Sequence, residues 1–153
     1  MAHLTEVVES RSALYDMETN ALGFWTKPMG YCALVAVFWD QHGSLYGHGR
    51  AQHCSGGLGA LQVGALFAGI AAPQLTVIVY GLSNEMLSGD NSKLSDLEAE
   101  CGRRNCPIRT YTATTAGSSV LTNAGVYQPK SDYDEQQQPA AENENKGRCC
   151  IIM

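Results

Sequence analysis

The sequence predicts a small α+β domain over residues 1–127, with a mainly antiparallel sheet and two or three helices. Two apolar runs, Tyr31–Trp39 and Leu75–Leu82, are rich in β-branched and aromatic residues, as is typical of buried strands. Ser92–Cys101 has apolar residues at helical spacing and ends before Gly102, a natural helix stop. Because the chain contains 16 glycines, a glycine-rich all-β barrel is the alternative fold.

The first elements are predicted to be a helix and a connection. Apolar residues recur at near-helical spacing over Thr5–Glu18, and Thr5 can cap that helix. Glycine and proline punctuate Asn20–Gly30, so this range is expected to be a connecting segment. Phe24 and Trp25 within it are expected to cover an edge of the core.

A hairpin is predicted to follow the first strand. Asp40–Gly43 has the composition of a turn, and Ser44–Gln52 is expected to return as the partner strand. One face of that strand is nearly bare, so a helix or a ligand should pack close against it. The face consists of Leu45, Gly47, Gly49 and Ala51.

The middle of the chain is ambiguous. Ser55–Ala72 can form a helix or a glycine-rich strand pair, and we favour the helix although each glycine costs it about 1 kcal/mol relative to alanine. Ser83–Asn91 is expected to be a loop, and Ile108–Thr114 a strand. Ala116–Val126 is expected to be an irregular or helical closing segment.

The composition changes after the predicted domain. Residues 128–148 contain few apolar side chains, so we expect a flexible acidic and polar tether that cannot fold alone. At about 5–6 Å times the square root of its length, it would separate the domain from an attachment point by on the order of 25 Å.

Residues 149–153 carry a lipidation pattern. Cys150 is followed by Ile151, Ile152 and Met153, which matches the C-a-a-X box in which a cysteine thiol receives a prenyl group. A final methionine favours farnesyl, and the neighbouring Cys149 is a candidate for reversible palmitoylation. This tail resembles those of prenylated small GTPases and of the lipidated longin-type SNARE, which implies membrane attachment. The rest of the sequence has neither a phosphate-binding loop nor a heptad run.

Charge and cysteine usage exclude several classes of function. The net charge of −5 argues against a nucleic-acid binder, which needs clustered lysine and arginine. No secretory signal is seen at the first residues, so the cysteines are expected to stay reduced. Cys101 and Cys106 have no matching second pair, so a four-thiolate zinc site is not expected. We expect no cofactor.

Histidines and a cysteine gather around the predicted hairpin. His42, His48, His53 and Cys54 are the candidate ligand or metal-binding residues, although no H-x-x-x-H pair is present. A nucleophile would require Cys54 or Cys32 beside one of these histidines. Burial of Cys32 in an apolar strand would raise its pKa and leave it inert, which makes Cys54 the better candidate.

Two weaker patterns remain. The order of elements from Tyr31 onward loosely resembles a ribonuclease H-like layout, which implies inward acids that hold two metal ions. Ala60 and Leu82 stand at plausible positions for such acids, so this resemblance implies a catalytically inactive domain. The turn Ser55–Gly57, before the predicted helix, could hold an anion.

Together these observations predict a non-enzymatic, lipid-anchored adaptor or scaffold on the cytosolic face of a membrane. Its partners would be the membrane, a prenyl transferase and an unknown protein, and unmodified chains would form a soluble cytosolic pool. The alternative is a small enzyme or ligand-binding domain with a pocket lined by His48, His53 and Cys54. The adaptor hypothesis predicts no such pocket and instead an exposed apolar patch.

Overall fold

The computed structural model describes residues 3–18, 20–83 and 94–137, which form two sheets and three helices. The predicted α+β class is confirmed. The strands are β1 (His3–Glu6), β2 (Tyr15–Asp16), β3 (Ala21–Thr26), β4 (Ala33–His42), β5 (Leu45–Cys54), β6 (Leu75–Tyr80), β7 (Ile108–Thr112), β8 (Ser119–Thr122) and β9 (Tyr127–Pro129). The helices are α1 (Ala60–Phe67), α2 (Ser95–Arg103) and α3 (Lys130–Gln136).

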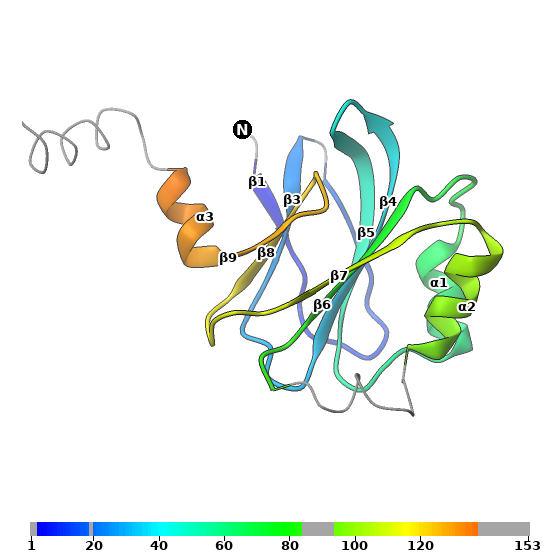
Figure 1. The fold of residues 1–153 in the computed structure, drawn as a ribbon, viewed down its shortest axis with the longest axis horizontal. Coiled ribbons are helices and arrows are strands. Elements are labelled where there is room, and N and C mark those ends of the chain that lie inside the picture. The colour runs from blue at the N-terminus through cyan, green and yellow to red at the C-terminus, as the bar shows by residue number, and fades with distance from the viewer. Residues whose placement is uncertain (1–2, 19, 84–93, 138–153) are drawn as a thin grey trace, which may run out of the picture.

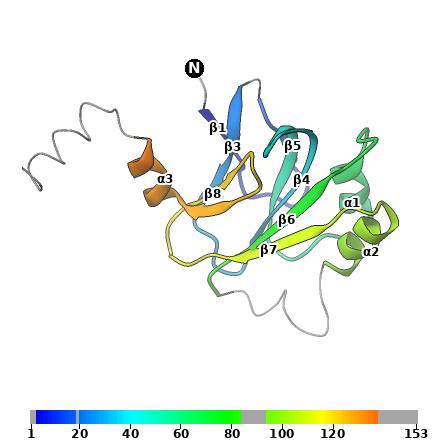
Figure 2. The ribbon, with the colours of Figure 1, turned by 45° about the horizontal axis from the view of Figure 1, so that its top comes forward.

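The strands are divided between a five-stranded sheet, in the order β2-β5-β4-β6-β7, and a four-stranded sheet, in the order β1-β3-β8-β9. Pairing is mainly antiparallel, as predicted, with parallel contacts between β1 and β3 and between β6 and β7. The structure therefore has two mixed sheets where the sequence suggested one. α1 and α2 lie side by side on one flank of the molecule, and the four-stranded sheet lies on the other (Figures 1 and 2).

Strand β4 is buried on both faces, which explains its uncharged apolar sequence. Ala33, Val35 and Val37 belong to the core beneath the helices, with Leu66 and Phe67 of α1. The alternate residues belong to a second core, shared with side chains of the four-stranded sheet: Leu34, Ala36 and Phe38 with Phe24 and Leu121. The prediction of a buried strand here is confirmed, with its start moved to Ala33.

The helix option for the glycine-rich middle is confirmed by α1, and the strand-pair option is wrong. Arg50 holds the end of this helix, since its Nη1 donates to the carbonyls of Ala65, Leu66 and Ala68 at 3.3, 3.3 and 2.7 Å. A cation at this end also opposes the negative end of the helix dipole. The predicted strand over Leu75–Leu82 is confirmed by β6.

The predicted helix over Thr5–Glu18 is wrong, because its segment pairs with a distant strand. β1 runs parallel to β3, and the N–H of Val7 donates to the carbonyl of Trp25 at 2.8 Å. The helical spacing of apolar residues is outweighed by these sheet hydrogen bonds, which satisfy the backbone and bury Thr5. The range Asn20–Gly30 is correspondingly not a simple connection, since it contains β3.

The closing segment also differs from the prediction. Ala116–Val126 is neither irregular nor helical throughout, because β8 within it pairs with both β3 and β9. The predicted turn Asp40–Gly43 begins too early, as β4 continues to His42 and the turn lies at Gly43 and Ser44. The later strand is confirmed by β7, and the predicted helix over Ser92–Cys101 by α2. This helix starts at Ser95 and continues through Gly102, the predicted stop, to Arg103.

The start of the expected tether is folded. β9 and α3 occupy the first part of the range 128–148, and Tyr133 of α3 is 8% exposed. Lys130 lies over the ring of Trp25 at 5.1 Å, which attaches α3 to the four-stranded sheet. In Figure 1, α3 directly follows β9 at the edge of this sheet. A flexible tether beginning at residue 128 is therefore wrong. Its remainder, residues 138–148, lies outside the described residues, as do the lipidation residues 149–153 and most of the predicted loop Ser83–Asn91.

Candidate functional site

The four predicted ligand residues of the hairpin do not form one site. His42 and His48 lie toward the turn of the β4–β5 hairpin, whereas His53 and Cys54 end β5. His48 and His53 are separated by about 17 Å along an extended strand. The predicted pocket lined by His48, His53 and Cys54 is therefore wrong.

At the turn end, the two histidines contact an acid instead of a cysteine. Nε2 of His42 lies 3.0 Å from Oδ1 of Asp40, and Nδ1 of His48 lies 3.0 Å from Oδ2 of the same carboxylate. The His48 ring stacks on Trp39 with 5.5 Å between ring centroids. All three polar side chains are well exposed, so these contacts are surface pairs of small energetic weight.

At the other end of β5, a titratable cluster lies at the junction of the two sheets. Within the described parts of the chain, Glu9, Cys32 and His53 form the one group whose carboxylate, thiol and imidazole atoms lie within 4.8 Å of one another. Three separate segments bring them together. Glu9 bridges to the backbone of His53, and Cys32 directly precedes β4, the partner strand of β5.

The hydrogen bonds of Thr26 fix the tautomer of His53. Oγ1 of Thr26 lies 2.6 Å from the carbonyl of Val7, which can only accept, so the threonine proton is donated there. The same Oγ1 lies 2.5 Å from Nδ1 of His53 and must therefore accept from that nitrogen. The remaining ring nitrogen, Nε2, carries a lone pair and has no hydrogen-bond partner among the described residues, although His53 is only 1% exposed.

Electrostatics keep this cluster neutral at the imidazole and protonated at the thiol. Burial lowers the pKa of His53, against the attraction of Glu9. Burial, followed by the negative charge of Glu9, raises the pKa of Cys32 to about 11. Sγ of Cys32 lies 3.5 Å from Oε2 of Glu9 and donates to it. Cys32 lies before β4 and is half-buried, so its predicted position inside a buried strand is wrong, although its pKa is raised as expected.

Cys54 is not a partner of His53, because neighbouring strand residues point to opposite faces. Cys54 belongs to the core beneath the helices, and its thiol donates to the carbonyl of Ala33 at 3.4 Å. Burial raises its pKa to about 11. The hypothesis of a Cys54 nucleophile activated by a hairpin histidine is wrong.

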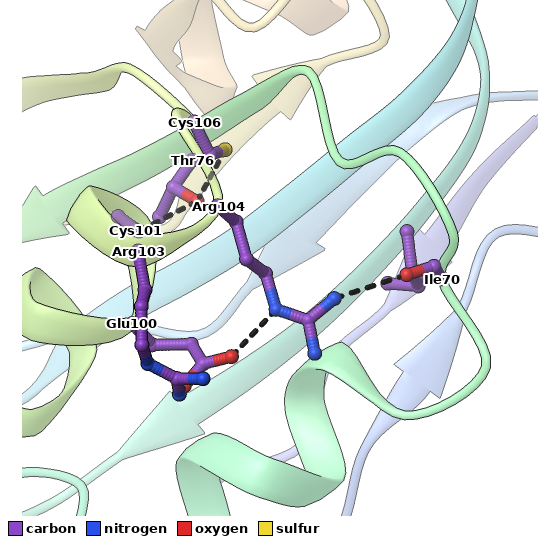
Figure 3. Close-up of polar contacts among 7 residues, drawn as sticks. All are labelled: Ile70, Thr76, Glu100, Cys101, Arg103, Arg104 and Cys106. Atoms are coloured by element: carbon purple, nitrogen blue, oxygen red, sulfur yellow. Dashed lines mark hydrogen bonds and ion pairs between the residues drawn. The ribbon is translucent and has the colours of Figure 1, made fainter.

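A second pair of thiols surrounds Thr76 between α2 and the five-stranded sheet (Figure 3). Cys101 donates to Oγ1 of Thr76 at 3.3 Å, and that hydroxyl lies 3.4 Å from Sγ of Cys106. The neighbouring thiol of Cys101 lowers the pKa of Cys106, as do Thr76 and the positive charge of Arg104, while burial opposes them. The pKa of Cys101 is raised by the same contact and by burial.

Arg104 also links the two helices of this flank. Its Nε lies 2.5 Å from Oε2 of Glu100, and its Nη1 donates to the carbonyl of Ile70 at 3.1 Å (Figure 3). Its guanidinium lies 5.1 Å from the ring centroid of Phe67. The charge that favours the Cys106 thiolate is thus held in place by contacts to both α1 and α2.

The predicted anion turn Ser55–Gly57 precedes α1, but the helix starts later, after Gly59. A cavity of about 540 Å³ is lined by this loop and Arg11. The N–H of Gly59 is already bonded to Oε1 of Gln62 at 2.6 Å, and Gln62 donates in turn to the carbonyl of Arg11 at 2.9 Å. The N–H of Gly59 is therefore already occupied and is not free to bind an anion at the start of α1.

Comparison with known proteins adds no family. No protein-family model and no curated protein matches the chain. The interpretation of the cluster therefore depends on its own residues.

Two neighbours of His53 are not predicted by the sequence. Glu9 falls in the predicted helix over Thr5–Glu18, and Thr26 falls in the predicted connection over Asn20–Gly30. Neither position is close to His53 in the chain, and both reach it only through pairing of β1, β3 and the segment after β1. The one available signal was Thr26 at the end of an aromatic segment, which could have been interpreted as a short strand.

Proposed function

We propose that the protein is a lipid-anchored peripheral membrane protein that acts as a non-enzymatic adaptor or scaffold on the cytosolic face. The observation that carries the proposal is the pattern Cys150-Ile151-Ile152-Met153, preceded by Cys149. In prenylation, the cysteine sulfur loses its proton and displaces diphosphate from a prenyl diphosphate, which forms a thioether. The result is a permanent apolar group on an otherwise polar segment.

Two lipids fit the proposal better than one. A single lipid chain gives marginal, reversible membrane binding, so a stable anchor needs a second acyl chain or a basic patch. Residues 128–148 contain more acids than bases, so attraction to anionic lipids adds little. Palmitoylation of Cys149 would supply the second signal. Among the helices of the described residues, none is long and apolar enough to cross a bilayer.

Two features of the folded part support an adaptor over the alternative of an enzyme. The histidines and Cys54 that an enzyme would have used are divided between two ends of a strand and two faces of a sheet. Large apolar side chains are also exposed at Val8 (51%), Tyr31 (66%) and Leu82 (46%). A docking partner could cover such side chains without any catalytic group.

The test is the intact mass of the protein isolated from its own host. We expect the mass of the chain to be increased by one farnesyl group and, in part of the population, by one palmitoyl group removable with hydroxylamine. Fragmentation should place both groups on Cys149 and Cys150. An unmodified Cys150, or a chain that continues beyond Met153, would overturn the proposal.

A further inference from the structure

We propose that Glu9, Cys32 and His53 form a binding site for a divalent transition-metal ion, with zinc as the best match. The three side chains offer a carboxylate oxygen, a sulfur and an imidazole nitrogen within 4.8 Å of one another. These are the donor types that zinc takes in proteins. The site is independent of the lipid anchor and of the exposed histidines of the hairpin.

The separations suit one ion. Zinc bonds of about 2.0–2.3 Å in a tetrahedron place neighbouring ligand atoms about 3.5 Å apart. Sγ of Cys32 and Oε2 of Glu9 already lie at 3.5 Å. The remaining pairs lie within 4.8 Å, and the exposed Glu9 side chain can move toward the ion by bond rotation.

His53 is prepared for a metal at Nε2. A buried nitrogen with an unused lone pair is costly unless something binds it. Metal-bound histidines commonly donate their other ring N–H to an oxygen, which fixes the tautomer and the ring. Here Nδ1 donates to Thr26, which is itself oriented by the carbonyl of Val7. The structure thus contains both the unpaired Nε2 and the hydrogen bonds through Thr26 that orient the imidazole ring.

The charges of the three groups favour a cation. Without an ion, the Glu9 carboxylate and a Cys32 thiolate would place two negative charges side by side, 3.5 Å apart. A divalent ion reverses this relation, because carboxylate and thiolate together neutralise its charge. A site with both sulfur and nitrogen donors selects zinc over magnesium or calcium, which prefer oxygen ligands.

The burial pattern indicates where the ion enters. His53 is buried at the inner end, Cys32 is half-buried and Glu9 is exposed. The solvent side of the cluster is therefore open, and three protein ligands leave a fourth position for water or a small ligand. Such an open position distinguishes zinc sites that react or exchange from closed structural sites.

The experiment is a titration of the reduced full-length protein with Co²⁺ as the spectroscopic probe, followed by displacement with Zn²⁺. We expect one equivalent of cobalt to bind with a thiolate-to-cobalt charge-transfer band that zinc abolishes. Cys32→Ser should remove the band. Glu9→Gln, an exposed change that leaves the fold intact, should weaken binding by about 10–100-fold.

The controls separate this site from the other thiols and histidines. Cys106→Ser and His48→Gln should retain the band and its affinity, and a Cys149→Ser/Cys150→Ser variant should do the same. Loss of the band in any control but not in Cys32→Ser would overturn the proposal. So would cobalt binding without a thiolate band, or no binding at all, in which case an ordered water satisfies Nε2 of His53.

Discussion

The imidazole of His53 donates from Nδ1 to Oγ1 of Thr26 across 2.5 Å, which joins the ends of the two sheets through a buried hydrogen bond. The hydroxyl of Thr26 in turn donates a hydrogen bond to the carbonyl of Val7. Thr26→Val retains the shape of the side chain but leaves a donor and an acceptor unpaired. We expect the free energy of unfolding to fall by on the order of 2 kcal/mol, measured by urea denaturation.

Two matched variants test the cause of that loss. Thr26→Ser keeps the hydroxyl and should restore most of the stability. Thr110→Val makes the same chemical change at an exposed position of β7 and should change stability by less than about 0.5 kcal/mol. Equal stability of Thr26→Val and the unmodified protein would show that this bond does not hold the sheets together.

Gly49 of β5 lies in the core between the two sheets, against the rings of Phe38 and Phe24. A Cβ atom there would lie 3.0 Å from Cδ1 of Phe38 and 3.1 Å from Cε2 of Phe24. Gly49→Val should therefore overpack the core between the sheets and lower the free energy of unfolding by about 1–3 kcal/mol. Thermal denaturation followed by circular dichroism would measure the change.

The control is a glycine with open space. Gly102 lies in α2, and a Cβ there meets nothing within 4 Å. Gly102→Ala should stabilise the protein by about 0.5–1 kcal/mol, since alanine favours a helix. An increase in stability for Gly49→Val would mean that Phe24 and Phe38 can rearrange without strain.

The same glycine shows what could be predicted from the sequence. Period-2 alternation identified a nearly bare strand face, and Gly49 and Ala51 on it are closely packed. The covering groups are Phe24 and Phe38 of the two sheets, so the expected helix or ligand is wrong. The predicted close packing is wrong at Leu45 and Gly47, which are exposed while Tyr46 between them is buried in the core between the sheets. The β4–β5 register is interrupted at Asp40, whose φ is 64°, so the alternation of faces changes there. Alternation in the sequence indicates which residues share a face of a regular strand. Irregular pairing with the neighbouring strand, which decides where that face is buried, is not visible in the local sequence.

Elements that depend on long-range pairing were not predictable from local pattern. The first strand has helical spacing, and only its pairing with β3 decides its conformation. The polar helix α3 contains one buried residue, Tyr133, so composition alone suggested an unfolded segment. The site around His53 was predicted only in part for the same reason. His53 was a candidate ligand, whereas Glu9 and Thr26 lie in segments whose conformation was predicted wrongly.

The Cys101–Cys106 pair leads to a prediction about pH. The Cys101 thiol and the Thr76 hydroxyl that it donates to lower the pKa of Cys106, so its thiolate persists to lower pH than that of an ordinary thiol. Alkylation requires the thiolate. Cys106 should therefore be alkylated before Cys101. As the pH is lowered, the alkylation rate of Cys106 should begin to fall at a lower pH than that of an ordinary cysteine. Peptide mass spectrometry after iodoacetamide treatment measures both rates.

Removing the donor tests this cause. Cys101→Ala deletes the hydrogen bond, so the pKa of Cys106 should rise and its rate profile should move to higher pH. Cys54→Ala, a buried thiol in the same core, should leave the profile of Cys106 in place. An unchanged profile in Cys101→Ala would assign the shift to Arg104 and Thr76.

The two tail cysteines make unequal contributions under the proposed anchor. Cys150→Ser removes the permanent lipid, and palmitoylation of Cys149 requires prior contact with a membrane, so the protein should move to the soluble fraction after cell fractionation. Cys149→Ser leaves one lipid, whose binding is weak and reversible, so part of the protein should dissociate from membranes on dilution. Each variant changes a single sulfur atom to oxygen at a position beyond the residues that the structure describes. Full membrane retention of Cys150→Ser would mean that another surface of the protein binds the bilayer.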